Sequence, residues 1–344
     1  MLAIVKSAKG RGNIELRDVP RPTIGEDEVL LEVRAAGLCG TDLHHYEVGD
    51  TVAAPVILGH ELVGLVAEVG RAVTGWHVGD RVVPETHAQI CGRCALCRSG
   101  AYYLCTDRKG LGSGVDGAFT RYVAVPARAL HRIPDDVPDG EAAVLQPAAD
   151  IVHAVVANSG LRPGQDVVVL GPGPMGLLTV EIACALGAGQ VIVVGLEADV
   201  ARLAIAQEVG ADRVVNASRE DTYTSIMDAT QGKGAETVFE VSGARQAFLD
   251  GLKILTRKGQ ITVVGVPTAA IEVDLHGLQA REQVIRTSIM SSWPDYETAI
   301  QLRRAGRLQL QPLISHVLPI TAWKEGFDLG LTKRGCKVIF TPGV

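Results

Sequence analysis

The sequence lacks the marks of membrane, secreted and nucleic-acid-binding proteins. No uninterrupted apolar run approaches the ~20 residues of a membrane span. The N-terminal stretch MLAIVKSAKG contains neither the apolar h-region nor the cleavage site of a secretory signal. Acidic residues outnumber basic ones by 39 to 33, and the net charge of −6 disfavours binding to nucleic acids or anionic membranes. Seven cysteines without a secretory signal fit the reducing cytoplasm, where we expect the protein to reside.

The chain also lacks internal repeats of roughly 20–50 residues and low-complexity tracts. Its 344 residues suggest about two domains. Residues 1–148 read as short apolar strands separated by Gly and Pro, which is typical of an all-β domain. Residues 149–288 alternate strands with helices, which predicts a parallel, doubly wound α/β sheet. Residues 289–344 contain a helix, a strand, a second helix and a last strand, and we expect them to return to the first domain.

Cysteine is concentrated in one short segment, CGRCALCRSGAYYLC, which holds Cys91, Cys94, Cys97 and Cys105. Four thiolates complete a tetrahedral zinc shell and leave no position for a substrate, so this cluster predicts a structural zinc site. The alternatives are disulfides or a nucleic-acid zinc ribbon, but close thiols in a chain without a signal peptide more often bind metal. Cys184 and Cys336 lie in apolar stretches, and we expect them to be buried, inert thiols.

A second set of candidate ligands has a different composition. Cys39 precedes the segment Gly59-His60-Glu61, and together these residues offer sulfur, nitrogen and oxygen donors. Three protein ligands at most leave a position for water or substrate, which zinc catalysis requires. A His-Glu pair alone is also typical of a surface turn, so the hypothesis depends on the rest of the chain.

A glycine-rich loop predicts a dinucleotide site. The apolar strand that ends at Leu170 is followed by GPGPMG and then by an amphipathic helix, LLTVEIACALGA. Glycines permit a tight turn and let backbone N–H groups approach a pyrophosphate at the helix N-terminus. A Gly/Pro-rich loop in an unrelated α/β domain is the alternative. The candidate cofactor-binding residues of this loop are Gly171, Gly173, Pro174, Met175 and Gly176.

Taken together, these segments resemble the zinc-dependent medium-chain alcohol dehydrogenases. The stretch GHELVGLVAEVGRAVTGWHVGDRV is similar to the zinc signature of that family, and with LCGTDLHHYEVG, the cysteine cluster and GPGPMG the match covers essentially the whole chain. The most similar branch contains polyol (sorbitol or L-iditol type), threonine and butanediol dehydrogenases. The resemblance implies a GroES-like, mostly-β catalytic domain around a Rossmann domain, an active site in the cleft between them, and a homo-oligomer, either a tetramer or a dimer.

The resemblance also implies roles for individual residues. Cys39 and His60 match the first two catalytic zinc ligands, and Glu61 matches a glutamate that is a ligand in the polyol branch and lies behind the ligands elsewhere. Thr41 and His44 match a proton-relay hydroxyl and histidine, although His44 beside another histidine could be a solvated loop residue.

The implied reaction passes a hydride from a secondary alcohol, on a polyol or vicinal diol, to NAD(P) and leaves a ketone. Two zinc ions per chain are implied, one catalytic and one structural. The alternatives are a threonine-type or other secondary-alcohol dehydrogenase and, in a different class, a zinc-ribbon binding protein. A zinc-free reductase of the same fold would lack the Cys39, His60 and Glu61 set.

Three positions depart from the family pattern. Gln146 stands where a Glu or Cys is usual; a neutral amide is a poor zinc ligand but can hydrogen-bond zinc-bound water, so we treat it as a site residue beside two anionic ligands, Cys39 and Glu61. Asp150 falls where the family places a small polar residue against the nicotinamide; a solvated aspartate at a helix start is the alternative. The residues before Trp293 lack the Arg that contacts polyols, which weakens a specific prediction of sorbitol.

The second strand of the α/β domain ends in Gly195, where NAD enzymes usually carry an Asp that bonds the ribose 2′-hydroxyl and repels a 2′-phosphate. Glu197 and Asp199 follow in a longer turn that offers one cation, Arg202. Two acids against one Arg favour NAD, with NADP possible. We also include Val266, which ends the predicted strand QITVVGV, among the cofactor-binding residues.

Overall fold

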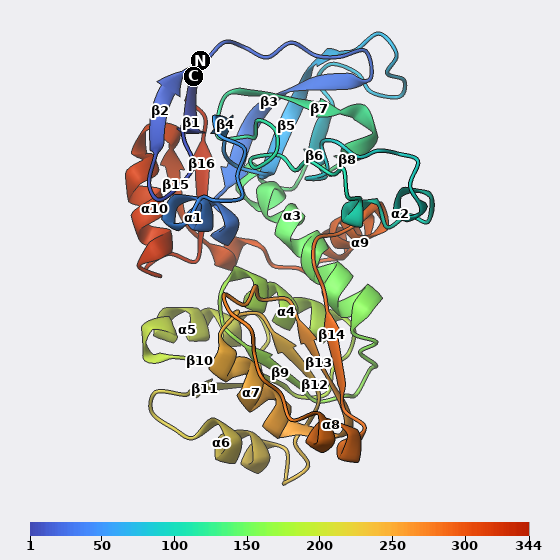
Figure 1. Ribbon diagram of the computed structural model, residues 1–344, viewed down its shortest axis with the longest axis vertical. Helices are drawn as coiled ribbons and strands as arrows, with labels where there is room; N and C mark the ends of the chain where they lie inside the picture. Colours follow the sequence, from blue (N-terminus) through green and yellow to red (C-terminus); the bar gives the residue numbers. More distant parts are fainter. Residues whose placement is uncertain (344) are drawn as a thin grey trace. The chain divides into compact units, whose positions relative to one another are not determined.

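The computed structural model describes residues 1–343 and divides into two compact units (Figure 1). The first unit contains Met1–Pro147, Ser292–Ile300 and the chain from Ile314 onward, and the second contains Ala148–Ser291 and Gln301–Leu313. Residues 289–291 and 301–313 therefore lie in the second unit, whereas the sequence analysis placed the whole of 289–344 with the first. In the described part of the chain, no helix combines the length and the apolar character needed to cross a bilayer.

The first unit is built on two β-sheets. The smaller one has the order β2-β1-β4, formed by Leu2–Lys6 (β1), Ile14–Asp18 (β2) and Val56–Ile57 (β4). The larger one has the order β15-β16-β3-β5-β6-β8, with β7 paired to β3. Its strands are Glu28–Gly37 (β3), Glu61–Val69 (β5), Arg81–Pro84 (β6), Tyr122–Pro126 (β7), Leu130–Arg132 (β8), Ile314–Pro319 (β15) and Lys337–Thr341 (β16).

Strand β3 connects segments that are distant in sequence. It pairs antiparallel with β5, where Gly37 lies opposite Glu61, and on its other side with β16, where Gly37 lies opposite Ile339. Strand β3 therefore lies between the C-terminal strand and β5, which begins at the glutamate of the GHE segment. The ring of Phe340, in β16, packs edge to face on the buried Phe119 ring with centroids 5.2 Å apart, and both belong to one apolar core.

The expectation of strands alone in residues 1–148 was wrong at three helices: α1 (Gly40–Glu47), α2 (Ala95–Arg98) and α3 (Asp139–Val152). Helix α1 buries polar side chains, Asp42 and His45, so it has no apolar stripe with helical period. Helix α2 is one turn long. Helix α3 contains Pro147, which in sequence reads as a helix end. The sequence also predicts helices α9 (Trp293–Arg304) and α10 (Trp323–Leu331); α10 belongs to this unit, and the boundary between the two units falls within α9, after Ile300.

The second unit is the doubly wound α/β domain that the sequence predicts. Its six-stranded parallel sheet has the order β11-β10-β9-β12-β13-β14, so the order reverses at β9, where ligands bind in folds of this kind. The strands are Val167–Leu170 (β9), Val191–Gly195 (β10), Arg213–Asn216 (β11), Ala235–Glu240 (β12), Leu255–Val263 (β13) and Val284–Thr287 (β14). The helices are α4 (Pro174–Ala185), α5 (Val200–Glu208), α6 (Thr222–Ala229), α7 (Arg245–Ile254) and α8 (Leu275–Arg281).

Candidate functional site

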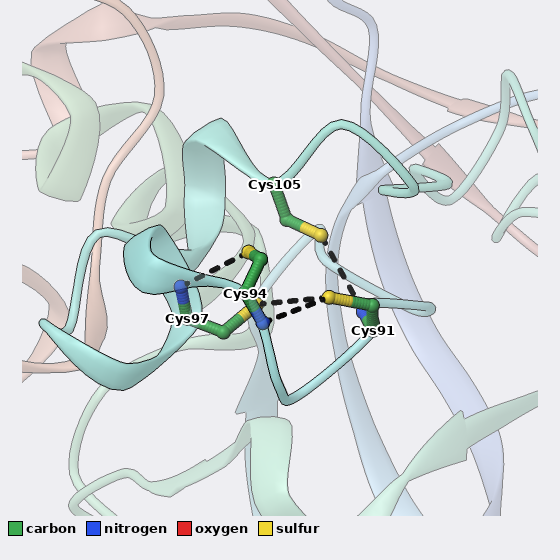
Figure 2. Close-up of side chains that lie close together, drawn as sticks. All are labelled: Cys91, Cys94, Cys97 and Cys105. Carbon is green, nitrogen blue, oxygen red and sulfur yellow. Dashed lines mark hydrogen bonds between the residues drawn. The ribbon is translucent and has the colours of Figure 1, made fainter.

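The cysteine-rich lobe folds its thiols toward one another (Figure 2). Cys94 caps the N-terminus of α2, Cys97 lies within it, and Cys105 follows a short 3-10 turn, Tyr102–Leu104. Backbone N–H groups donate to the sulfurs: Cys94 N to Cys91 Sγ, Cys97 N to Cys94 Sγ and Cys91 N to Cys105 Sγ, each at 3.4 Å. The three-residue spacing thus turns successive thiols inward.

The geometry and charge of this lobe suit a closed metal site. The four sulfurs lie within 4.8 Å of one another, and Cys91 Sγ is 3.9 Å from Cys97 Sγ. A zinc ion with Zn–S bonds of about 2.3 Å needs sulfurs about 3.8 Å apart. Backbone N–H donors, that of Arg93 first, lower the pKa of Cys91 to about 6, whereas burial and its thiol neighbours raise that of Cys97 to about 12. A divalent cation would remove this conflict between neighbouring thiolates.

All seven cysteines within residues 1–343 are free thiols, which disfavours the disulfide alternative. The expectation that Cys184 is buried was wrong: it is exposed, and its thiol lies 3.4 Å from the carbonyl oxygen of Gly210. Cys336 is half-buried. Cys184 directly follows Gly176–Ala183, the buried residues of α4, so the burial of this helix ends just before it.

The mixed donor set also converges. Cys39 caps α1, His60 precedes β5, and Glu61 is the first residue of β5. Their ligand atoms lie within 4.8 Å of one another. Burial disfavours a charged His60, but the negative charges of Cys39 and Asp42 outweigh it and raise the pKa of His60 to about 10. A site that holds protons this tightly has a surplus of negative charge, and its sulfur, nitrogen and oxygen donors suit a zinc ion with an open position.

Asp42, which the sequence analysis missed, binds both ligand-bearing segments. Its buried carboxylate accepts hydrogen bonds from Cys39 N (3.0 Å) and Gly59 N (3.2 Å), and it lies 3.9 Å from His60 Nδ1. Burial raises its pKa, although these partners favour the ionised form. An acid at the third position of α1, after a capping residue, is a capping-box signal that could have identified it.

Lys337, the first residue of β16, forms a buried ion pair with Glu61. Its Nζ donates to both carboxylate oxygens at 2.8 and 2.7 Å, and the two side chains are 3% and 0% exposed. Burial opposes the lysine charge, but Glu61 outweighs it and raises the pKa of Lys337. The sequence analysis counted Cys39 and Glu61 as two anions beside the metal, and the charge of Lys337 offsets one of them. No local signal identifies this lysine, because 276 residues separate the partners.

The remaining predicted residues of the alcohol site take different positions. The Thr41 hydroxyl lies 3.7 Å from Cys39 Sγ, and His44 is exposed on α1. Gln146 is buried in α3, at 3% exposure. The alternative reading of Asp150 as a solvated residue at a helix start is wrong, because Asp150 lies near the C-terminal end of α3 and accepts a 2.6 Å hydrogen bond from the Ser291 hydroxyl.

The glycine loop between β9 and α4 has the geometry that a pyrophosphate requires. Gly171 adopts a positive φ of 111°, which an L side chain rarely adopts. A Cβ on Gly176 would lie 1.9 Å from the carbonyl oxygen of Gly171, so the helix packs directly on the turn. Gly173, by contrast, caps α4 and faces open space, with Pro174 as the first helical residue. The helix N-terminus is thus accessible for an anion. Val266, beyond β13, is 78% exposed.

One of the two acids in the turn after β10 makes its contacts within the turn itself. Asp199 is buried, accepts a hydrogen bond from Leu196 N at 3.2 Å and lies 3.6 Å from Arg202, so both of these candidates stabilise the turn. Glu197 is half exposed and is held by Arg219, which the sequence analysis missed. Glu197 is therefore the acid in the better position to meet a ribose.

Comparisons with known proteins agree with this arrangement. A family model for the alcohol dehydrogenase GroES-like domain matches residues 25–135, and one for zinc-binding dehydrogenases matches residues 174–304. A sorbitol dehydrogenase from Halalkalibacterium halodurans is 38% identical over 343 residues, 99% of each protein. An L-threonine 3-dehydrogenase from Pyrococcus horikoshii is 36% identical, covering 99% of this chain and 98% of that protein. A Sinorhizobium meliloti structure with bound NADP has a TM-score of 0.92 and 29% identity, covering 99% of both chains.

We expect Cys97→Ser to lower the zinc content by one ion per chain and to lower Tm, because three sulfurs cannot close the shell. Metal analysis and thermal unfolding test this. Cys184→Ser, at an exposed thiol outside both donor sets, is the matched control and should change neither quantity. A Cys97→Ser protein with unchanged zinc content and Tm would contradict the assignment of a closed site.

We expect Lys337→Met to lower the free energy of unfolding by about 3–5 kcal/mol, because it leaves the Glu61 carboxylate buried without a counter-charge. Urea unfolding of chelator-treated protein measures this. Adding Glu61→Gln should recover much of the loss. Lys253→Met, which removes an exposed lysine paired with Asp250, is the control and should have little effect. If the Lys337→Met protein and the unmutated protein have the same free energy of unfolding, the Lys337–Glu61 pair does not stabilise the fold.

Proposed function

Because the chain belongs to the family of zinc-dependent medium-chain alcohol dehydrogenases, we propose that it oxidises a secondary alcohol on a small polyol or vicinal diol to a ketone, with NAD(P) as hydride acceptor. The observation that carries this proposal is the convergence of Cys39, His60 and Glu61 within 4.8 Å, a donor set with an open position. The glycine loop and α4 of the second unit supply the dinucleotide site that such a reaction needs.

Each chain would hold two zinc ions, one among the four clustered cysteines and one at Cys39, His60 and Glu61. When bound at the open site, zinc supplies Lewis acidity that lowers the pKa of a hydroxyl. Asp42 and Lys337 fix the ligands from behind through the contacts described above. Gln146 would stay outside the metal's coordination and add no charge to it.

Two residues of α1 are proposed to carry the displaced proton. The Thr41 hydroxyl, 3.7 Å from Cys39 Sγ, is close enough to the donor set to accept a proton from a substrate hydroxyl there. His44 lies three residues further along the same helix and is exposed, so it can pass a proton to solvent. Asp150, bound to Ser291, is proposed to lie beside the nicotinamide in the second unit.

The proposed substrate class, small polyols and vicinal diols, is based on the relatives. They also support L-threonine as an alternative substrate. The sorbitol and threonine enzymes are similarly related to this chain, at 38% and 36% identity. Sorbitol and L-threonine both carry a secondary hydroxyl next to a polar group, so a panel of polyols, vicinal diols and L-threonine decides between them. NAD(P)H formation is the measurement.

We also propose a homo-oligomer, either a tetramer or a dimer. The outer strand of the second unit's sheet, β14, has all four residues exposed, and they include Val284 and Ile285. An unpaired edge strand with apolar side chains invites a further strand. Analytical ultracentrifugation of the full chain tests this proposal.

We expect Cys39→Ala and His60→Ala each to lower kcat/KM for the best alcohol by about a thousandfold or more, the size of effect that losing a metal Lewis acid produces. Dinucleotide affinity should stay nearly unchanged, since its loop belongs to the other unit. Cys184→Ala is the control and should keep full activity. Full activity in a zinc-depleted preparation would refute the proposed zinc mechanism.

We expect a higher kcat/KM with NAD than with NADP, since Glu197 is positioned to accept the ribose 2′-hydroxyl and would oppose a 2′-phosphate. Initial rates with both coenzymes at one saturating alcohol concentration give this ratio. A clear advantage for NADP would contradict the assignment of Glu197 to the ribose.

A further inference from the structure

Four polar residues gather at the carboxyl ends of two adjacent strands of the second unit. Glu197 follows β10, and Asn216, Ser218 and Arg219 lie at and after the end of β11. The strands are parallel neighbours, with Gly195 opposite Asn216. The carboxyl ends of parallel strands form the ligand-binding edge of a doubly wound sheet, so this cluster lies on the dinucleotide side.

Glu197 is held at several points. Its carboxylate accepts from Arg219 Nε at 2.6 Å, from Arg219 Nη2 and from Asn216 Nδ2 at 2.8 Å. Its backbone N–H donates to the Ser218 hydroxyl oxygen at 3.0 Å. The Arg219 contact is thus bidentate, the geometry in which guanidinium groups bind both carboxylates and phosphates.

Gly195 explains why the acid lies on the turn and not at the strand end. A Cβ at Gly195 would lie 2.8 Å from Pro172 Cγ, in the glycine loop, and 3.0 Å from Leu203 Cδ2. An Asp at this position would collide with the loop that surrounds the pyrophosphate. The nearest acid that fits is Glu197, two residues later, where it comes within reach of Arg219.

The pair is built in a way that allows exchange with a ligand. The Glu197 and Arg219 side chains are 52% and 67% exposed, and an ion pair this open to water contributes little to stability. Replacing the carboxylate by another anion therefore costs little. Arg202 is not an alternative cation, because its side chain is only 12% exposed and is paired with Asp199.

We propose that Arg219 is a specificity-determining residue that lets this site accept NADP as well as NAD; this inference rests on the proposed dehydrogenase function. With NAD, Arg219 and Asn216 hold the Glu197 carboxylate to accept the ribose 2′-hydroxyl. With NADP, Arg219 exchanges Glu197 for the 2′-phosphate, and the Ser218 hydroxyl has one hydrogen to donate to it. A related Sinorhizobium meliloti structure contains NADP.

The experiment is a fluorescence titration of the full-length protein with NADH and with NADPH, which needs no turnover. Unmutated protein should bind NADPH with a Kd within about tenfold of that for NADH, with NADH the tighter. Arg219→Ala should weaken NADPH at least about tenfold, the loss of a charge-assisted hydrogen bond, and NADH less than about threefold. Arg219→Lys should restore part of the NADPH affinity. Glu197→Gln should shift the ratio toward NADPH.

Arg334→Ala is the matched control, since Arg334 forms a similarly exposed pair with Asp328 in the first unit and should leave both affinities unchanged. Equal losses for the two coenzymes in Arg219→Ala, an unchanged ratio, or unmutated protein that binds one coenzyme alone or neither would each overturn the proposal. If the ratio responds as expected but no alcohol is oxidised, the proposed function fails and the role of Arg219 stands. If alcohols are oxidised but the ratio ignores Arg219, this inference alone fails.

Discussion

The buried charges around the open donor set are the constraint on which the first unit depends. A carboxylate without a partner is costly to bury, and this unit buries two next to each other, Asp42 and Glu61. Glu61 is stabilised by Lys337 from the last strand, and Asp42 by backbone N–H groups of Cys39 and Gly59. Each solution fixes a segment that carries a candidate ligand. The ligand positions are therefore set by the folded chain itself, which is the preorganisation that a catalytic metal site requires.

The two donor sets of the first unit differ in how they are assembled. The cysteine lobe is local: one short segment with a single-turn helix brings four sulfurs together, and backbone N–H groups orient them. The mixed set is non-local. Strand β3 must pair with β5, and α1 must form after β3, before Cys39 meets His60. A local sulfur cluster suits a structural ion, which stabilises a loop. A set mounted on a sheet keeps its geometry while one coordination position exchanges ligands.

The second unit divides the recognition of a dinucleotide between rigid and exchangeable groups. Its glycine loop is fixed by close packing, since a Cβ on Gly176 would collide with Gly171 and a Cβ on Gly195 would collide with Pro172. The Glu197–Arg219 ion pair is exposed to water and held by charge and hydrogen bonds between side chains. In the proposed binding mode, the backbone of the loop contacts the pyrophosphate, which both coenzymes share. The ribose 2′ position, which distinguishes them, is contacted by side chains that can change partners at low cost.

The sequence by itself determined the features that are encoded within short segments. Spacing and periodicity predict three such features: the four clustered thiols, the strand, glycine loop and helix of the candidate dinucleotide site, and the doubly wound α/β class. The sequence does not predict helix α1, because its buried residues are polar. It does not predict α3 either, because Pro147 reads as a helix end. Only the tertiary structure decided which charges meet: Lys337 reaches Glu61 across 276 residues, and Arg219 reaches Glu197 across neighbouring strands. Ion pairs of this kind depend on sheet order and register, which bring distant residues side by side and leave no periodic signal in the chain.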